Sequence, residues 1–227
     1  MLEMIMGGGK STNNTGPGPS ELVGYWTDGN GRETGYFGSV TGTIASGWFS
    51  NQELVSKIPY SNTVGNVVSG SAVWLKFLLD GKILFMPVSS IANGSYWNNL
   101  NFGRLVYGGR NGQPTTEITI ADAKFTVRLP RAALTDPAPD STINNSEWAR
   151  CMYPIASTVS AETTENGAKW DSIVIPMSAT FVPCQETLYG DSTRALGIYY
   201  AVASVSRSLK NTPVSSFSWR PVLEWIP

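Results

Sequence analysis

The sequence predicts a β-rich fold, mostly of short strands, with one or two short helices. Three features point to this class. The apolar runs have the length of strands, 23 Gly and 14 Pro residues interrupt them, and Asp-Gly and Asn-Gly pairs stand between several of them. Such pairs are the strongest short-range signal for a β-hairpin. Because no segment sustains a helical period, an all-β sandwich is the alternative.

The first strands are expected over residues 24–40, a segment rich in glycine and aromatic residues. Within it, Asp28-Gly29 and Asn30-Gly31 supply the residue types that tight turns require. We therefore expect short strands on either side of these turns.

The clearest hairpin lies in the segment Val73–Pro87, where two apolar runs flank Asp80-Gly81. Asp-Gly favours the turn whose twist matches that of the paired strands. The two strands are expected over residues 72–78 and 82–88.

Alternating apolar residues over Ile118–Leu129 predict one or two more strands. Ser146 is a good N-cap for a short helix that reaches Arg150 or beyond, and Pro154 would end that helix.

Three further strands are expected in the last third of the chain, over residues 171–182, 198–205 and 217–227. Each segment is rich in Val, Ile, Tyr, Phe or Trp, which suit a pleated and partly buried surface.

Residues 1–20 form a segment of different composition. A methionine-rich tip leads into Gly, Ser, Thr, Asn and Pro, which cannot bury a core. We expect an extended docking arm at residues 1–20 and a single globular domain at residues 21–227. The arm residues expected to contact a partner protein are Met1, Leu2, Met4, Ile5, Met6 and Lys10.

The run GGGKST at Gly7–Thr12 resembles a phosphate-binding P-loop but fails on spacing. That motif requires a glycine five residues before Gly9, and Met4 occupies the position. Nucleotide binding is therefore not expected there.

Composition disfavours several classes of function. With 16 basic and 17 acidic residues, the chain has a net charge of −1 and lacks the positive potential that would hold a nucleic-acid backbone. The sequence has no histidine, the residue most used in acid–base catalysis and metal binding. Apolar stretches are too short to cross a membrane. We expect no enzyme activity, cofactor or metal, no nucleic-acid partner and no membrane insertion.

The two cysteines, Cys151 and Cys184, stand 33 residues apart and form no CxxC pair. Two buried thiols are the expected state, and a single disulfide is the alternative.

Carboxylates are scattered among turns, and nothing selects a catalytic pair. Aromatic residues in Gly/Asn-rich context are candidate glycan contacts, with packing in the core or in a subunit interface as the alternative. These candidates are Tyr25, Trp26, Tyr36, Tyr96 and Trp97.

The C-terminal segment combines Trp219, Arg220 and Glu224 within six residues. In a strand Arg220 and Glu224 share a face. Arg220 is expected to form a structural ion pair with an acidic residue elsewhere, such as Glu147.

Seven segments follow one another in a characteristic order: GYFG at Gly35–Gly38, WLKFLLDGKILFMP at Trp74–Pro87, SYWNNLN at Ser95–Asn101, VYG at Val106–Gly108, FTVRLPRA at Phe125–Ala132, SEWARCMYPI at Ser146–Ile155 and SWRPVLE at Ser218–Glu224. The series resembles virion structural proteins of tailed bacteriophages. The resemblance implies a virion structural protein, without fixing its place in the particle. We expect a homo-oligomeric component of a fibre, spike or other appendage. Its arm is expected to dock onto other capsid or tail proteins, and its domain is expected to contact a host surface glycan. A capsid decoration (cement) protein is the alternative.

A more distant similarity links the VRLP and SEW segments and the terminal WRPVLE to formylglycine-generating enzymes and C-type-lectin-like domains. It implies an α+β domain of the C-type-lectin-like kind, with short twisted strands and long loops. The expected structural framework of this domain is Arg128, Glu147, Trp148, Trp219, Arg220 and Glu224. Those enzymes need a closely spaced cysteine pair, which this chain lacks, so no active site is carried over. A glycan-acting or cysteine-modifying enzyme remains the alternative from another class.

Overall fold

The computed structural model describes most of the chain from Thr15 onward. The described residues are 15–28, 30–41, 48–139, 146–157, 170–177, 180–199, 204–212 and 216–227. The GGGKST run and the six residues expected to dock the arm (Met1, Leu2, Met4, Ile5, Met6 and Lys10) lie outside them.

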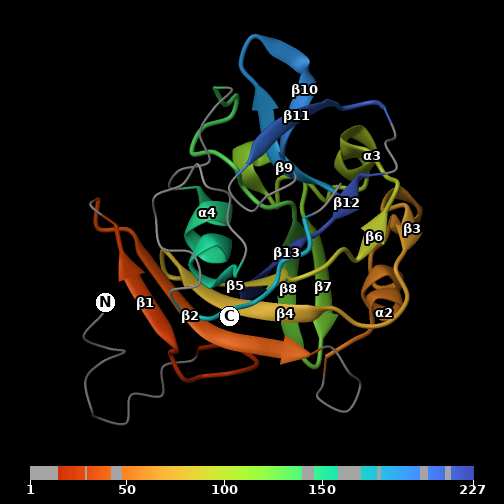
Figure 1. Ribbon diagram of the computed structural model, residues 1–227. Coiled ribbons are helices and arrows are strands. Elements are labelled where there is room, and N and C mark those ends of the chain that lie inside the picture. Colours follow the sequence, from red (N-terminus) through yellow and green to blue (C-terminus); the bar gives the residue numbers. More distant parts are fainter. Residues whose placement is uncertain are drawn as a thin grey trace.

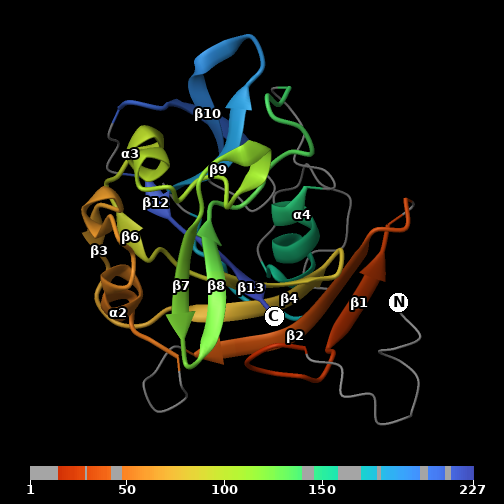
Figure 2. The ribbon, with the colours of Figure 1, turned by 180° about the vertical axis from the view of Figure 1, so that it is seen from behind.

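A seven-stranded antiparallel sheet forms the centre of the molecule (Figure 1). Its strands, in spatial order, are β1 (Gly24–Thr27), β2 (Glu33–Thr41), β4 (Val73–Leu79), β5 (Lys82–Pro87), β13 (Val222–Ile226), β8 (Ala123–Arg128) and β7 (Thr116–Ile120). The C-terminal strand β13 is therefore inserted between β5 and β8, so the chain end is part of the core sheet (Figure 2).

Two small antiparallel sheets and three short α-helices complete the described part of the fold. One sheet contains β9 (Phe181–Leu188), β10 (Asp191–Tyr199) and β11 (Val205–Leu209), and the other contains β3 (Asn66–Val67), β6 (Ala92–Asn93) and β12 (Ser218–Trp219). The helices are α2 (Asn51–Ser56), α3 (Trp97–Phe102) and α4 (Glu147–Met152), joined by 3-10 turns at Ser61–Thr63, Arg110–Gly112 and Tyr153–Ile155. This confirms the β-rich α+β class.

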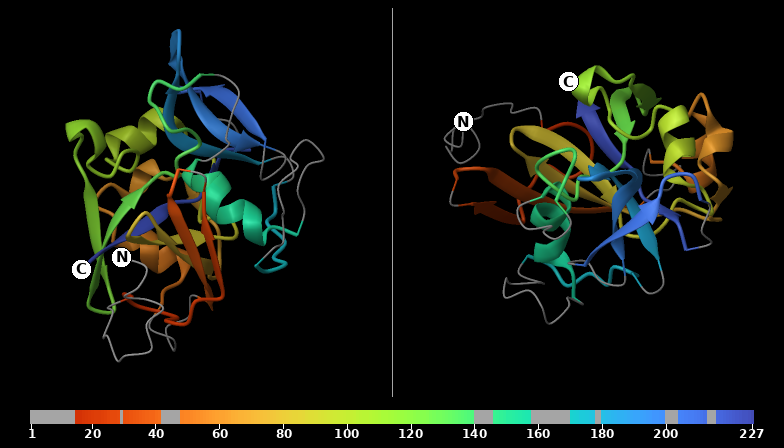
Figure 3. Two further views of the ribbon diagram at one scale, coloured as in Figure 1. Left: turned by 90° about the vertical axis from the view of Figure 1, so that its left-hand side faces the viewer. Right: turned by 90° about the horizontal axis from the view of Figure 1, so that it is seen from above.

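The central strands of the large sheet are buried on both faces, which explains why β4 is apolar on both sides, with Lys76 as its one charged residue. Trp74 and Leu78 point to a core shared with α2 and α3, whereas Leu75 and Phe77 point to a core shared with α4, β9 and β10. Successive residues of a strand face opposite sides. Figure 3 shows α4 and the β9–β10–β11 sheet over one side of the central strands.

The hairpin expected at Asp80-Gly81 is confirmed, with β4 and β5 within one residue of the predicted bounds. Both turn residues adopt left-handed backbone conformations (φ 49° and 82°), as a type I′ turn requires. The turn between β7 and β8 uses the same conformations at Ala121 and Asp122 (φ 45° and 65°) without a glycine.

Three of the other predicted elements also form. β1 and β2 flank the turn that begins at Asp28. Residues 118–129 form most of the β7–β8 hairpin. Ser146 caps α4, since its hydroxyl accepts a hydrogen bond from the Ala149 amide.

The strand expected over residues 171–182 is wrong in its position. The ladder begins only at Phe181, although Ile175 and Met177 are buried and Val174 is exposed. Buried and exposed residues alternate because this extended segment packs against the core. Before Phe181 its described residues make only a single bridge, at Ile173.

Two further strand predictions need correction. The run over residues 198–205 is not one strand, because β10 ends at Tyr199 and β11 begins at Val205. The C-terminal run is split into β12 and β13, which belong to different sheets. Pro221 stands between them and has no amide hydrogen to donate to a ladder.

The described end of the expected arm, residues 15–20, contacts the domain. The Pro19 carbonyl accepts a hydrogen bond from the ammonium of Lys76, which is fully buried and lies 4.9 Å from the centre of the Phe37 ring. Gly16 sits so close to Trp225 that an added Cβ would lie 2.9 Å from its ring. Burial lowers the pKa of Lys76 to about 8.

Candidate binding site

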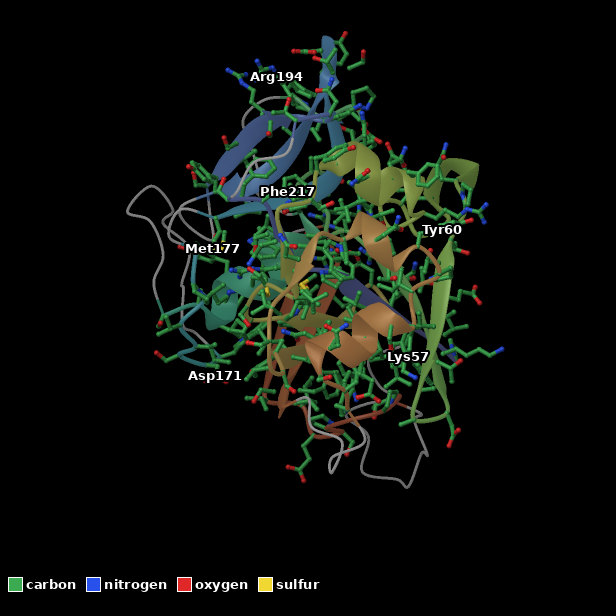
Figure 4. The ribbon with its side chains drawn as sticks, turned by 90° about the vertical axis from the view of Figure 1, so that its right-hand side faces the viewer. Lys57, Tyr60, Asp171, Met177, Arg194 and Phe217 are labelled. Carbon is green, nitrogen blue, oxygen red and sulfur yellow. The ribbon has the colours of Figure 1, made fainter. Side chains whose placement is uncertain are left out.

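An exposed pair of aromatic rings marks one side of the molecule, where α3 ends. Phe102, the last residue of α3, is 72% exposed, and Tyr60 is 36% exposed. Their ring centres lie 5.9 Å apart at an angle of 61°, an edge-on contact. Figure 4 shows Tyr60 on the side that carries α3. Exposed aromatic clusters of this kind are typical of binding surfaces.

A pocket of about 180 Å³ opens beside these rings. Its lining residues are Asn101, Phe102, Arg104, Val106, Tyr107, Gln113 and Pro114. Together with Tyr60 they are called the aromatic pocket below. The lining includes two side-chain amides, one guanidinium group and no carboxylate. The pocket therefore offers hydrogen-bond donors and one positive charge beside apolar ring faces.

Arg104, which lines this pocket, has a left-handed backbone conformation that is unusual for a residue other than glycine. After α3, the Leu105 amide donates to the Leu100 carbonyl (2.9 Å) and the Arg104 amide donates to the Asn101 carbonyl (3.0 Å). These two hydrogen bonds define a common helix ending in which the residue after the cap is left-handed. That residue is usually glycine, but here it is Arg104, with φ 59°. Its guanidinium carbon lies 5.8 Å from the centre of the Tyr60 ring.

The inner wall of the pocket is fixed by Tyr107. Its ring meets the edge of Trp97 at 5.9 Å, and the Trp97 indole donates a hydrogen bond to the Cys184 carbonyl (2.9 Å). Burial, with a smaller contribution from Asp136, raises the pKa of Tyr107 to about 12. The Tyr107 hydroxyl is therefore neutral at physiological pH and can donate or accept a hydrogen bond.

Behind Tyr107 lies a buried carboxyl group, that of Glu186 in β9. It accepts a hydrogen bond from the Ala132 amide (3.0 Å), and its other oxygen lies 3.4 Å from Arg110 Nη1 and 3.7 Å from Arg131 Nε. Burial raises the pKa of Glu186 to about 7, although the Ala132 amide and both guanidinium groups lower it. This carboxyl group changes charge near neutral pH.

The framework residues form a buried ion-pair network. Arg128 donates two hydrogen bonds to Glu147 (2.8 and 2.7 Å) and one to Glu224 (3.0 Å). Lys82 also pairs with Glu224. The network ties α4, β5, β8 and β13 together. Trp148 and Trp219 are buried in the two cores.

The ion pair expected between Arg220 and Glu147 is wrong. Arg220 donates to the carbonyls of Val88 and Pro176, while Glu147 is held by Arg128. Arg220 lies between β12 and β13, so its side chain joins loops rather than reaching α4. Its role in holding the chain is still structural.

A second ion pair was not predicted from the sequence. Arg150 of α4 donates two hydrogen bonds to the Asp80 carboxylate (2.7 and 2.8 Å) and others to Thr34 and the Glu33 carbonyl. Asp80 occupies the β4–β5 turn, and nothing in its local sequence indicates a distant partner.

The five aromatic residues predicted to contact glycans differ in exposure, and they do not form one surface. Tyr36 is 0% exposed and Trp97 is 4% exposed, so their predicted surface role is wrong. Tyr36 lies in a strand between two buried layers, and Trp97 is the inward-facing first residue of α3. Tyr25 and Trp26 on β1 and Tyr96 before α3 are partly exposed but belong to separate elements.

Sequence reasoning missed Tyr60, Phe102 and Arg104. Each stands alone in its local sequence, and their contact depends on the packing of α3 against the turn at residues 61–63. The only local signal was the sequence Phe102-Gly103-Arg104 at a helix end, which does not reveal that Phe102 is exposed.

Cys151 and Cys184 are both free and buried, as expected, and burial raises their pKa values well above the usual range. Among the described residues, no helix is long and apolar enough to span a membrane. The same part of the chain has no group of three Cys, Asp or Glu side chains placed to hold a metal ion.

No protein-family model, curated protein or solved structure matches this chain.

Proposed function

We propose that the chain is a structural protein of a bacteriophage virion, part of a fibre, spike or other appendage. In this proposal the first residues dock onto another virion protein, and the domain faces outward and contacts a host surface. The ordered series of seven segments from GYFG to SWRPVLE supports the virion assignment. The aromatic pocket supports the contact role, because Phe102 exposes most of an apolar ring to solvent.

The architecture suits a protein that must keep its shape outside a cell. The Arg128–Glu147–Glu224 network ties the C-terminal strand to α4 and β8 through buried groups. Breaking such a pair leaves an uncompensated buried charge, which strongly disfavours partial opening. The domain can therefore present the aromatic pocket on a rigid support.

The docking role of the N-terminal segment is tested by truncation. Removal of residues 1–14 retains Pro19 and its hydrogen bond with Lys76, so the domain should fold with an unchanged circular dichroism spectrum. Incorporation into particles should fall to background, measured by immunoblot of gradient-purified particles from a complemented deletion strain. Normal incorporation of the folded, truncated chain would show that docking lies elsewhere.

A capsid decoration protein is the second candidate within the same class, and it predicts a different copy number. A cement protein contributes to shell stability and occurs in hundreds of copies, whereas an appendage component occurs in a handful to a few dozen. An enzyme acting on glycans is the candidate from another class. Chromatography of glycans incubated with the pure domain separates binding from turnover, because only an enzyme releases product.

A further inference from the structure

We infer that the aromatic pocket binds an acidic saccharide, with a sugar ring stacked on Phe102 and its carboxylate paired with Arg104. The inference rests on the proposed surface-contact role and names the chemical class of its ligand. Three features of the pocket carry it: an exposed ring, an arginine placed against its backbone preference, and a polar lining without acidic groups.

The first feature is the exposure of Phe102. It is more exposed than most large apolar side chains of the described chain, and its one ring partner is Tyr60. An exposed ring face suits the apolar C–H face of a sugar, which leaves the sugar hydroxyls free for neighbouring polar groups. The amides of Asn101 and Gln113 line the same pocket and can bind such hydroxyls.

The second feature is that position 104, where the backbone is left-handed, holds an arginine and not a glycine. The left-handed conformation there (φ 59°) is one that glycine adopts without strain. Gly103, one residue earlier, has an ordinary φ of −72° and is packed so tightly that an added Cβ would lie 2.4 Å from the Thr63 hydroxyl. The fold therefore uses glycine where space is short and carries arginine where glycine would be favoured. A strained residue of this kind is typical of functional sites.

The third feature is charge. Arg104 is exposed, and within the described residues it forms no ion pair. Its guanidinium group lies over Tyr60, which fixes its position at the pocket. Arginine binds carboxylates through two parallel hydrogen bonds. The pocket volume of about 180 Å³ has room for one sugar ring. An acidic sugar can pair its carboxylate with the Arg104 guanidinium, which a neutral sugar cannot do.

The test compares two sugars that differ only in the carboxylate. The full-length protein, labelled with ¹⁵N, is titrated with methyl glucuronide and with methyl glucoside, and amide shifts are followed by NMR. The glucuronide should bind at least ~10-fold more tightly than the glucoside, and shifts should centre on residues 101–114. Equal affinity for the two sugars, or no binding of either, would overturn the inference.

Two variants and one control identify the groups responsible. Arg104→Asn retains a residue that tolerates left-handed backbone, so it should fold normally and bind both sugars equally. Phe102→Ala should weaken both sugars by ~10-fold or more. Tyr189→Ala removes another exposed aromatic ring, 75% exposed on the β9–β10 hairpin, and should change neither affinity. A similar loss in Tyr189→Ala would mean non-specific binding and contradict the inference.

An acidic peptide is the competing type of ligand. If Gly-Glu-Gly shifts the same amides at the same concentrations as methyl glucuronide, the pocket recognises carboxylates in general and the saccharide assignment fails. The proposed virion role would survive that result, because it is decided by the composition of purified particles and not by sugar binding.

Discussion

At the scale of single residues, Glu186 is a buried group whose protonation couples to folding near neutral pH. Its carboxyl group is buried in β9, and it faces the Ala132 amide, Arg110 and Arg131. Burial raises its pKa to about 7, against 4.5 for an ordinary glutamate. Between these two values the folded state binds more protons than the unfolded state. Its contribution to stability is therefore complete at low pH and is lost as pH rises through about 7.

Glu186→Gln is expected to remove this pH dependence. The amide keeps the shape of the side chain but does not ionise. Wild type should lose about 1–3 kcal/mol of unfolding free energy relative to the variant between pH 5 and pH 8, measured by urea unfolding. Glu117→Gln, at an exposed position of β7, is the matched control and should follow wild type. Parallel profiles for wild type and Glu186→Gln would contradict the assignment of the buried charge.

The residues of the aromatic pocket could not be identified from their local sequence. Arg104 and Phe102 each occur in an ordinary local sequence. Their importance appears only once α3 ends in a left-handed residue and brings the guanidinium over Tyr60. A pattern of residue types carries no information about such contacts between segments more than 40 residues apart. By contrast, the burial of Cys151 and Cys184 was predictable, because free cysteines behave as small apolar residues.

At the scale of elements, the two type I′ hairpins differ in how well their residues suit the turn. The β4–β5 turn uses Asp80-Gly81, the preferred pair, whereas the β7–β8 turn places Ala121 and Asp122 in left-handed conformations. Left-handed backbone costs a residue with a side chain more than it costs glycine. The β7–β8 turn is therefore a site where stability can be gained.

Asp122→Gly is expected to raise the unfolding free energy by about 0.5–1 kcal/mol, since glycine adopts φ 65° without a clash. The reverse change in the other hairpin, Gly81→Ala, should lower it by about 1–2 kcal/mol. Thermal unfolding of both variants measures the two effects. A lower melting temperature for Asp122→Gly would show that the Asp122 side chain stabilises the turn by more than its backbone strain costs.

The elements that could be predicted from sequence are those fixed by short-range chemistry. The β4–β5 hairpin follows from Asp80-Gly81, and the start of α4 follows from the Ser146 cap. Residues 171–182 show where such reasoning fails. Ile175 and Met177 are buried as an alternating pattern predicts, yet the segment makes no ladder before Phe181, because ladder formation depends on a neighbouring strand.

At the scale of the whole molecule, the C-terminal strand and the described residues 15–20 are built into the domain. β13 lies between β5 and β8, and Glu224 within it pairs with Arg128 and Lys82. Residues 15–20 lie against the same region, where Gly16 meets Trp225 and Pro19 accepts from Lys76. None of these pairings is visible in sequence, since each joins segments more than 50 residues apart. The fold class could be predicted, whereas the order of strands could not.

Among the described residues, the ion pairs that tie elements together and the aromatic pocket lie in separate regions of the fold. The ion pairs of Arg128 and Arg150 fix α4 to the large sheet, and the aromatic pocket lies at the end of α3. This separation places the proposed contact surface away from the ion pairs that hold α4 on the sheet. It also allows pocket variants such as Arg104→Asn to be studied without loss of the fold.

The central claim, that the chain is a virion structural protein, is tested most directly by quantitative mass spectrometry of particles purified through a density gradient. The claim predicts that the chain sediments with the particles at a fixed copy number, a handful to a few dozen for an appendage component or hundreds for a decoration protein. Its presence only in the soluble lysate fraction, with none in infectious particles, would contradict the claim.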